Sequence, residues 1–84
     1  MKYRLVYTKR ALRDIKNLHP QVRQRVGQSL KRFESDPLKF AHRLTDLRIG
    51  SYRFRIGEYR VVFDLEGEEI VVLRVGHRRD IYKR

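Results

Sequence analysis

The sequence has no cysteine and no tryptophan, and only two prolines and five glycines among its 84 residues. Without cysteine there can be no disulfide and no thiolate metal site, which fits a cytoplasmic protein. No apolar run approaches the ~20 residues that a membrane-spanning helix needs. The N-terminus "MKYRLVYTKR" also lacks the apolar core of a signal peptide. We therefore expect a cytoplasmic protein without disulfides.

Acidic residues are scarce as well, since 10 Asp and Glu face 21 Lys and Arg, for a formal net charge of +11. This charge exceeds the magnitude of about 2–8 that is usual for the surface of a small domain. Such a basic excess points to an anionic partner, namely nucleic acid, an anionic membrane surface or an acidic protein. The length suffices for one modest core, so we expect a single domain over residues 1–84.

The first half of the sequence predicts one strand and two helices. Lys2 to Tyr7 alternates like a strand, and Thr8 is a suitable N-cap for the helix that follows. That helix is marked by apolar residues at helical spacing: Ala11, Leu12, Ile15 and Leu18. A second helix begins at Pro20 and ends near "SDP", because Pro37 disfavours helix in the residue before it. The two helices are expected to form a helical hairpin.

The second half predicts three strands after a connector, Lys39 to Gly50, whose structure the sequence leaves open. We expect the apolar residues of this connector to pack into the core: Phe40, Leu44 and Leu47. In "SYRFRIGEYRVVF" two alternating runs flank Gly57-Glu58, which is typical of a hairpin with a two-residue turn. A last strand covers Ile70 to Gly76, and a basic tail, "HRRDIYKR", follows. The order βααβββ predicts an α+β fold, with the two-helix hairpin packed on one face of a small, mostly antiparallel sheet.

The hairpin has one apolar face and one basic face. The apolar face, expected to lie under the helices, consists of Tyr52, Phe54, Ile56, Tyr59, Val61 and Phe63. Arg53, Arg55 and Arg60 lie on the other face, which we expect to be uncovered. A two-residue turn would place Arg55 opposite Arg60, and like charges in that position destabilise a sheet. An anion between them would remove this repulsion, and guanidinium groups match phosphate oxygens in bidentate geometry. We therefore expect this face to bind phosphate.

The tail adds further candidates, His77, Arg78, Arg79 and Tyr82, because it can curl over the same face. Arginine stays protonated near neutral pH, so Arg60 and Arg78 are expected to stabilise charge and not to accept protons. The proton acceptor must then be another group, and Glu58, His77 and Tyr82 are all candidates.

The sequence shows no metal-binding or cofactor-binding motif. The acidic residues of the second turn, Asp64, Glu66, Glu68 and Glu69, do not have the spacing of a calcium loop. There is also no glycine-rich phosphate loop and no serine–histidine–acid set. We therefore expect chemistry without a metal ion or a cofactor.

The segment "YRFRIGEYRVVF" followed by "VLRVGHRRDIY" resembles the RelE/ParE superfamily of toxin–antitoxin toxins, and the resemblance runs through the whole chain. RelE-like members are ribosome-dependent endoribonucleases that cut messenger RNA in the A site, by attack of a ribose 2′-hydroxyl on the adjacent phosphate. ParE-like members instead poison DNA gyrase. Both kinds are neutralised by a cognate antitoxin that wraps the toxin.

By position, the resemblance assigns the functional residues of RelE-like nucleases to Arg53, Arg55, Arg60, Arg78 and Tyr82. Together with the reasoning above, it leads us to expect catalytic roles for Arg60, Arg78, Tyr82 and His77, and substrate binding by Arg53, Arg55 and Arg79. The first two positions are often lysine in such nucleases, whereas here both are arginine.

The resemblance thus implies a RelE-like endoribonuclease toxin that acts on messenger RNA on the ribosome. Two alternatives belong to other functional classes: a ParE-like inhibitor of DNA gyrase that cleaves nothing, and a plain basic nucleic-acid-binding module.

Overall fold

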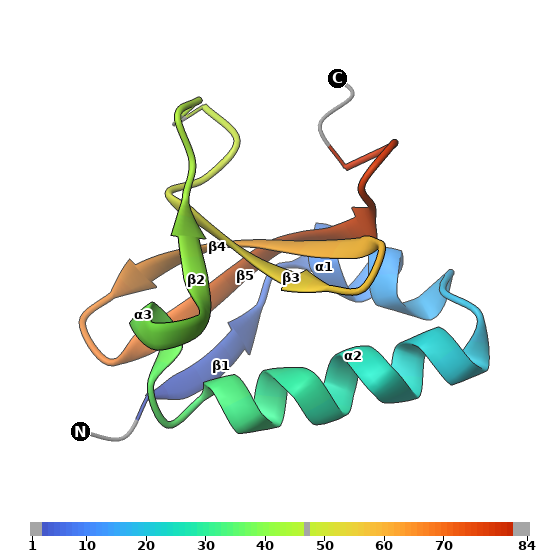
Figure 1. Cartoon of the computed structure of the whole chain (residues 1–84), viewed down its shortest axis with the longest axis horizontal. Coiled ribbons are helices and arrows are strands. Elements are labelled where there is room, and N and C mark those ends of the chain that lie inside the picture. Colours follow the sequence, from blue (N-terminus) through green and yellow to red (C-terminus); the bar gives the residue numbers. More distant parts are fainter. Residues whose placement is uncertain (1–2, 47, 82–84) are drawn as a thin grey trace.

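The computed structural model describes residues 3–46 and 48–81. Five strands form one sheet in the order β1-β5-β4-β3-β2, in which β1 runs parallel to β5 and the other neighbours are antiparallel. The helix α2 lies along one face of this sheet (Figure 1). The elements, in chain order, are β1 (Arg4–Tyr7), α1 (Lys9–Lys16), α2 (Pro20–Phe33), α3 (Pro37–Phe40), β2 (Ala41–Arg43), β3 (Tyr52–Ile56), β4 (Tyr59–Glu66) and β5 (Glu69–His77).

The predicted α+β fold is confirmed, since helices pack against a mixed, mostly antiparallel sheet. Thr8 caps α1 by accepting the N–H of Ala11 at 3.1 Å, and Pro20 occupies the first turn of α2. Within the described residues, no helix is both long and apolar enough to cross a membrane.

Two short elements that the sequence patterns did not predict, α3 and β2, lie at the start of the connector. The first is a single helical turn, and the second is a three-residue edge strand that pairs Ala41 with Phe54 and Arg43 with Tyr52. Elements this short hold too few side chains to show a period of 2 or 3.6. The strand β2 depends on its pairing with β3, and the Phe40 ring of α3 stacks on Phe33 of α2, so both elements need partners that they meet only in the folded chain.

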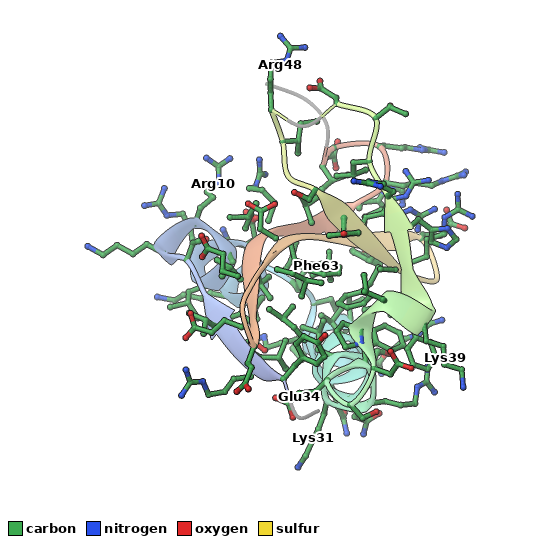
Figure 2. The ribbon with its side chains drawn as sticks, turned by 90° about the vertical axis from the view of Figure 1, so that its left-hand side faces the viewer. Arg10, Lys31, Glu34, Lys39, Arg48 and Phe63 are labelled. Atoms are coloured by element: carbon green, nitrogen blue, oxygen red, sulfur yellow. The ribbon has the colours of Figure 1, made fainter. Side chains whose placement is uncertain are left out.

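The core lies between the sheet and α2 and confirms the predicted apolar face of the hairpin. Phe54, Val61 and Phe63 are fully buried, and the Phe54 and Phe63 rings stack with centroids 4.2 Å apart. Figure 2 shows Phe63 in this interior. The helix contributes Val26, Leu30 and Phe33. Each such side chain stabilises the fold by about 1.5–3 kcal/mol when fully buried, so this cluster fixes which face of the hairpin points inward.

The helix α1 covers the edge of β5 beyond the end of β1. Thr8 donates its hydroxyl to the carbonyl of Leu73 at 3.2 Å. Further along the same edge, Asp14 Oδ2 accepts the backbone N–H of Val75 at 3.0 Å and Nε of Arg74 at 2.8 Å. These bonds satisfy backbone groups that would otherwise need a neighbouring strand. The carboxylate of Asp14 therefore joins the end of β5 to the helical layer.

The face of the sheet away from α2 is partly covered, which corrects the expectation that nothing would cover it. Figure 1 shows the segment between β2 and β3 rising on this side of the sheet. It closes over Val62, whose exposure is 0% although its side chain belongs to this face. The segment can approach Val62 this closely because Gly50 has no side chain. A Cβ on Gly50 would stand 2.5 Å from Cγ1 of Val62 and 3.0 Å from Cδ1 of Leu73.

The two glycines Gly50 and Gly27 should therefore respond in opposite directions to the same substitution. Gly50→Ala forces a methyl group against Val62 and should lower the free energy of unfolding by about 1–3 kcal/mol. Gly27 lies on the exposed side of α2 with no atom within 4 Å of its Cβ position. Gly27→Ala should raise the same free energy by about 0.5–1 kcal/mol, because alanine is the better helix former. Urea unfolding of both variants measures the two effects, and a Gly50→Ala protein as stable as the wild type would contradict this packing.

Candidate anion-binding site

The hairpin register places the arginines as the alternation predicted. Arg55 lies directly opposite Arg60 and Ile56 opposite Tyr59, which confirms the two-residue turn. Gly57 in that turn has φ of 61°, a conformation that favours glycine. Because side chains alternate along each strand, Arg55 and Arg60 share the face away from α2 with Arg53. We call this surface, with Arg53, Arg55 and Arg60, the arginine face.

Arg60 is held more closely than an exposed surface arginine would be. It lies on β4, the middle strand of the sheet. Its Nη1 donates to the carbonyl oxygens of Gly57 at 2.8 Å and of Tyr59 at 2.9 Å. Its guanidinium is therefore fixed beside the turn before any ligand arrives, which is the arrangement that favours stabilisation of a developing charge.

The tail folds back over the arginine face, as the sequence predicted that it could. Ile81 is buried, with its Cδ1 3.5 Å from where a Cβ on Gly76 would stand. Gly76 is the cross-strand neighbour of Arg60, so this position belongs to the arginine face. The N–H groups of Asp80 and Ile81 both donate to the carbonyl of His77, which turns the chain back.

The same turn brings Arg78 to the hairpin. The backbone N–H of Arg78 donates to the carbonyl oxygen of Glu58 at 2.8 Å. Its guanidinium Nε also lies 2.7 Å from Oε2 of Glu58, with both side chains more than half exposed. Arg78 therefore stands at the end of the hairpin that carries Arg60. Glu58, one of the three candidate proton acceptors, is engaged in an ion pair there.

The other tail residues take different positions. His77 is the cross-strand neighbour of Tyr59, and the two rings meet edge to face with centroids 5.5 Å apart. Its side chain thus belongs to the face toward the helices, and the structure does not bring it together with the arginine face. Its Nδ1 accepts the backbone N–H of Arg79 at 3.1 Å, while the Arg79 side chain is exposed. Tyr82, like Leu47 of the connector, lies outside the described residues.

Three basic residues near the hairpin were not singled out from the sequence. His42 is the β2 neighbour of Arg53, and Arg74 is the β5 neighbour of Val62, so both belong to the arginine face. The third, Arg25 of α2, reaches the hairpin turn, since a Cβ on Gly57 would stand 2.9 Å from its Nη2. The alternation in "VLRVG" could have indicated Arg74, whereas nothing local to the sequence indicates His42 or Arg25.

Beside Arg53 the surface is hollowed by a pocket of about 310 Å³, which Leu44, Thr45, Asp46 and Ile49 also line. Leu44 was expected in the core, but its place in the pocket is on the other side of the sheet. Arg48, at the far end of this segment (Figure 2), donates to Asp46 at 3.0 and 3.1 Å. This side-chain hydrogen bond and the charge of Asp46 raise the pKa of Arg48.

Among the described side chains, guanidinium groups from β3, β4 and the tail thus lie on the arginine face, near the hairpin turn. No group of three His, Asp or Glu side chains within the described ranges could hold a metal ion. Guanidinium groups on adjacent strands suit a ligand with repeating negative charges, and a polynucleotide backbone is such a ligand.

Comparison with known proteins shows the family to which this chain belongs. Residues 5–82 match the family model described as the ParE toxin of type II toxin–antitoxin systems, parDE. The chain is 32% identical over 87 residues to Toxin RelG of Mycobacterium tuberculosis, covering 100% of both chains. It is 25% identical to Toxin RelE3 of Methanocaldococcus jannaschii, covering 94% of each.

The fold is similar to that of a chain in the crystal structure of the toxin–antitoxin complex RelBE2 from Mycobacterium tuberculosis. The TM-score is 0.82 at 27% identity, and the match covers 93% of this chain and 100% of that one. The family match spans nearly the whole chain and includes the hairpin that carries the arginine face. This protein therefore belongs to the RelE/ParE family of type II toxin–antitoxin toxins.

Proposed function

We propose that this toxin is a ribosome-dependent endoribonuclease that cuts messenger RNA in the A site. The observation that carries the proposal is the direct pairing of Arg55 with Arg60, beside which the tail places Arg78. Like charges in this arrangement oppose folding unless an anion binds between them. A phosphodiester of the message is an anion that guanidinium groups can hold in bidentate geometry.

In the proposed reaction the ribose 2′-hydroxyl attacks the adjacent phosphate. A bond forms between the 2′-oxygen and phosphorus, and the bond to the 5′-oxygen of the next nucleotide breaks. The 2′-hydroxyl loses its proton to a base, and the leaving 5′-oxygen gains a proton. Arg53, Arg55 and Arg79 hold the RNA backbone, while Arg60 and Arg78 stabilise the negative charge that grows on the phosphate.

Proton transfer falls to groups other than arginine. We assign the donor for the leaving oxygen to Tyr82, because a phenol still carries its proton near neutral pH. His77 accepts the N–H of Arg79 and contacts the Tyr59 ring, so we assign it a structural role and not one in proton transfer. It fixes the start of the tail on the sheet, and so acts on the reaction through the position of Arg78.

We also propose that a cognate antitoxin of acidic and apolar character binds this chain. A similar toxin has been crystallised in a toxin–antitoxin complex. The net charge of +11 would speed and orient an encounter with an acidic partner. A segment that is disordered when free could wrap the basic surface and occlude it.

Inhibition of DNA gyrase is the second candidate function, because the matching family model is described by the ParE toxin. An inhibitor that only binds a protein target has no use for a fixed guanidinium cluster with a proton donor. The two functions differ in the process that stops first in the cell, which makes them separable by experiment.

Expression of this chain alone should arrest growth by stopping translation, and co-expression of the antitoxin encoded beside it should relieve the arrest. Pulse labelling with an amino acid measures protein synthesis, and primer extension on translated messages locates the cuts. We expect protein synthesis to fall before DNA supercoiling changes, with cuts inside translated codons. Continued protein synthesis together with inhibited gyrase would contradict the nuclease proposal and favour the ParE-like function.

Arg60→Lys should slow cleavage although it keeps the positive charge, because lysine lacks the planar fork of guanidinium. Loss of one preorganised donor typically costs about 10²–10³ in rate. Tyr82→Phe keeps the ring and removes only the hydroxyl, so it should also slow cleavage. The measurement is single-turnover cleavage of A-site message on programmed ribosomes.

Arg13→Ala provides the matched control, because Arg13 is an exposed arginine on α1, outside the arginine face. Its loss should only weaken RNA attraction in a salt-dependent way. If Arg60→Lys cleaves at the wild-type rate, or if all three variants behave alike, the assigned role of Arg60 is wrong.

A further inference from the structure

Arginines from three separate elements converge on the turn between β3 and β4. Arg60 donates to the carbonyl oxygens of Gly57 and Tyr59, at 2.8 and 2.9 Å. Arg25 of α2 lies against Gly57, and Arg78 reaches the turn from the end of β5. The two residues of the turn are Gly57 and Glu58, and the carboxylate of Glu58 pairs with the guanidinium of Arg78.

The contact between Glu58 and Arg78 has the chemistry of a phosphate contact. Nε of Arg78 lies 2.7 Å from Oε2 of Glu58, within the range of charge-assisted hydrogen bonds. A carboxylate and a phosphate both present anionic oxygens to the same guanidinium donors, so the two would compete for Arg78.

The backbone allows this exchange without moving Arg78 away from the site. Its N–H donates to the carbonyl of Glu58 at 2.8 Å, a bond that does not involve either side chain. The side chains are 54% and 62% exposed, so solvent screens their attraction and the ion pair is weak. Arg78 therefore stays at the turn when its guanidinium changes partner.

We propose that the carboxylate of Glu58 occupies the position beside the Arg78 guanidinium that an RNA phosphate takes in the substrate complex. This inference rests on the proposed action on RNA and adds a positioning residue to the site. Glu58 holds the Arg78 guanidinium at the turn in the free toxin and opposes binding of single phosphates. A polynucleotide displaces Glu58 because it is held at the same time by Arg55 and Arg60.

The test measures binding of a single-stranded RNA oligonucleotide with 2′-O-methyl riboses, which the 2′-hydroxyl reaction cannot cut. Glu58→Gln keeps the size of the side chain and the backbone bond to Arg78. The matched control is Glu66→Gln, an exposed residue at the far end of β4 with the same change in charge. At low salt, Glu58→Gln should bind the RNA about two- to fivefold more tightly than the control, the gain expected from removing an exposed ion pair.

A double-mutant cycle with Arg78→Ala tests the mechanism, because a purely structural effect of Glu58 would survive loss of Arg78. In the Arg78→Ala protein, Glu58→Gln should bind no more tightly than Glu66→Gln in the same background. Thermal unfolding of each variant shows whether it is folded. Equal affinities of Glu58→Gln and Glu66→Gln, or a gain that persists without Arg78, would overturn the proposal.

Failure of this inference differs from failure of the proposed nuclease activity. A toxin that cuts message on ribosomes but shows no coupling between Glu58 and Arg78 refutes the role of Glu58 alone. If Glu58 and Arg78 are coupled in binding of the 2′-O-methyl RNA but no message is cut on ribosomes, the competition between Glu58 and phosphate stands. The proposed nuclease activity is then wrong. If no variant binds the RNA, the proposal that an RNA phosphate binds at Arg78 is wrong.

Discussion

The register of the β3–β4 hairpin is the constraint on which the rest of the structure depends. A slip of β3 by one residue would turn Phe54 outward and carry Arg53 and Arg55 toward the core. Burial of such side chains is worth about 1.5–3 kcal/mol each, whereas facing like charges cost a few tenths of a kcal/mol or more. The energy gained by packing against α2 therefore exceeds the cost of the repulsion, and this packing places Arg55 opposite Arg60. The basic face exists because the apolar face is so strongly fixed.

The segments around the hairpin turn this pair of charges into a site. Asp14 of α1 holds Arg74 and the N–H of Val75, which fixes the end of β5 from which the tail departs. The turn after β5 then returns the chain toward the hairpin, where Arg78 meets Glu58. The site is thus assembled from groups far apart in sequence on strands whose spacing the core sets. In the proposed function this rigidity matters, because a fixed guanidinium stabilises a growing charge without reorganising.

Local patterns explain why much of the fold could be predicted from the sequence. The alternation of Ser51 to Phe63, the Gly57-Glu58 turn and the Thr8 cap each depend on neighbours in the chain, and all three appear in the structure. The missed features depend on distant partners. Asp14 meets Arg74 60 residues later, β2 exists only beside β3, and a bulge between Val62 and Phe63 shifts the pairing with β5. The position of His77 beside Tyr59 likewise follows from strand register, which the tail sequence alone does not reveal.

If the arginine face opposes folding and binds an anion, one charge reversal on it should change both stability and RNA affinity. Arg55→Glu places a carboxylate opposite Arg60, where opposite charges stabilise a strand pair by roughly 0.2–1 kcal/mol. Urea unfolding and RNA binding are measured on the same protein, with Arg13→Glu as the control for net charge. We predict a higher free energy of unfolding for Arg55→Glu and a loss of RNA affinity well beyond that of the control. A less stable protein would show that the pairing of Arg55 with Arg60 does not oppose folding, and RNA binding as tight as that of the control would show that Arg55 does not bind the anion.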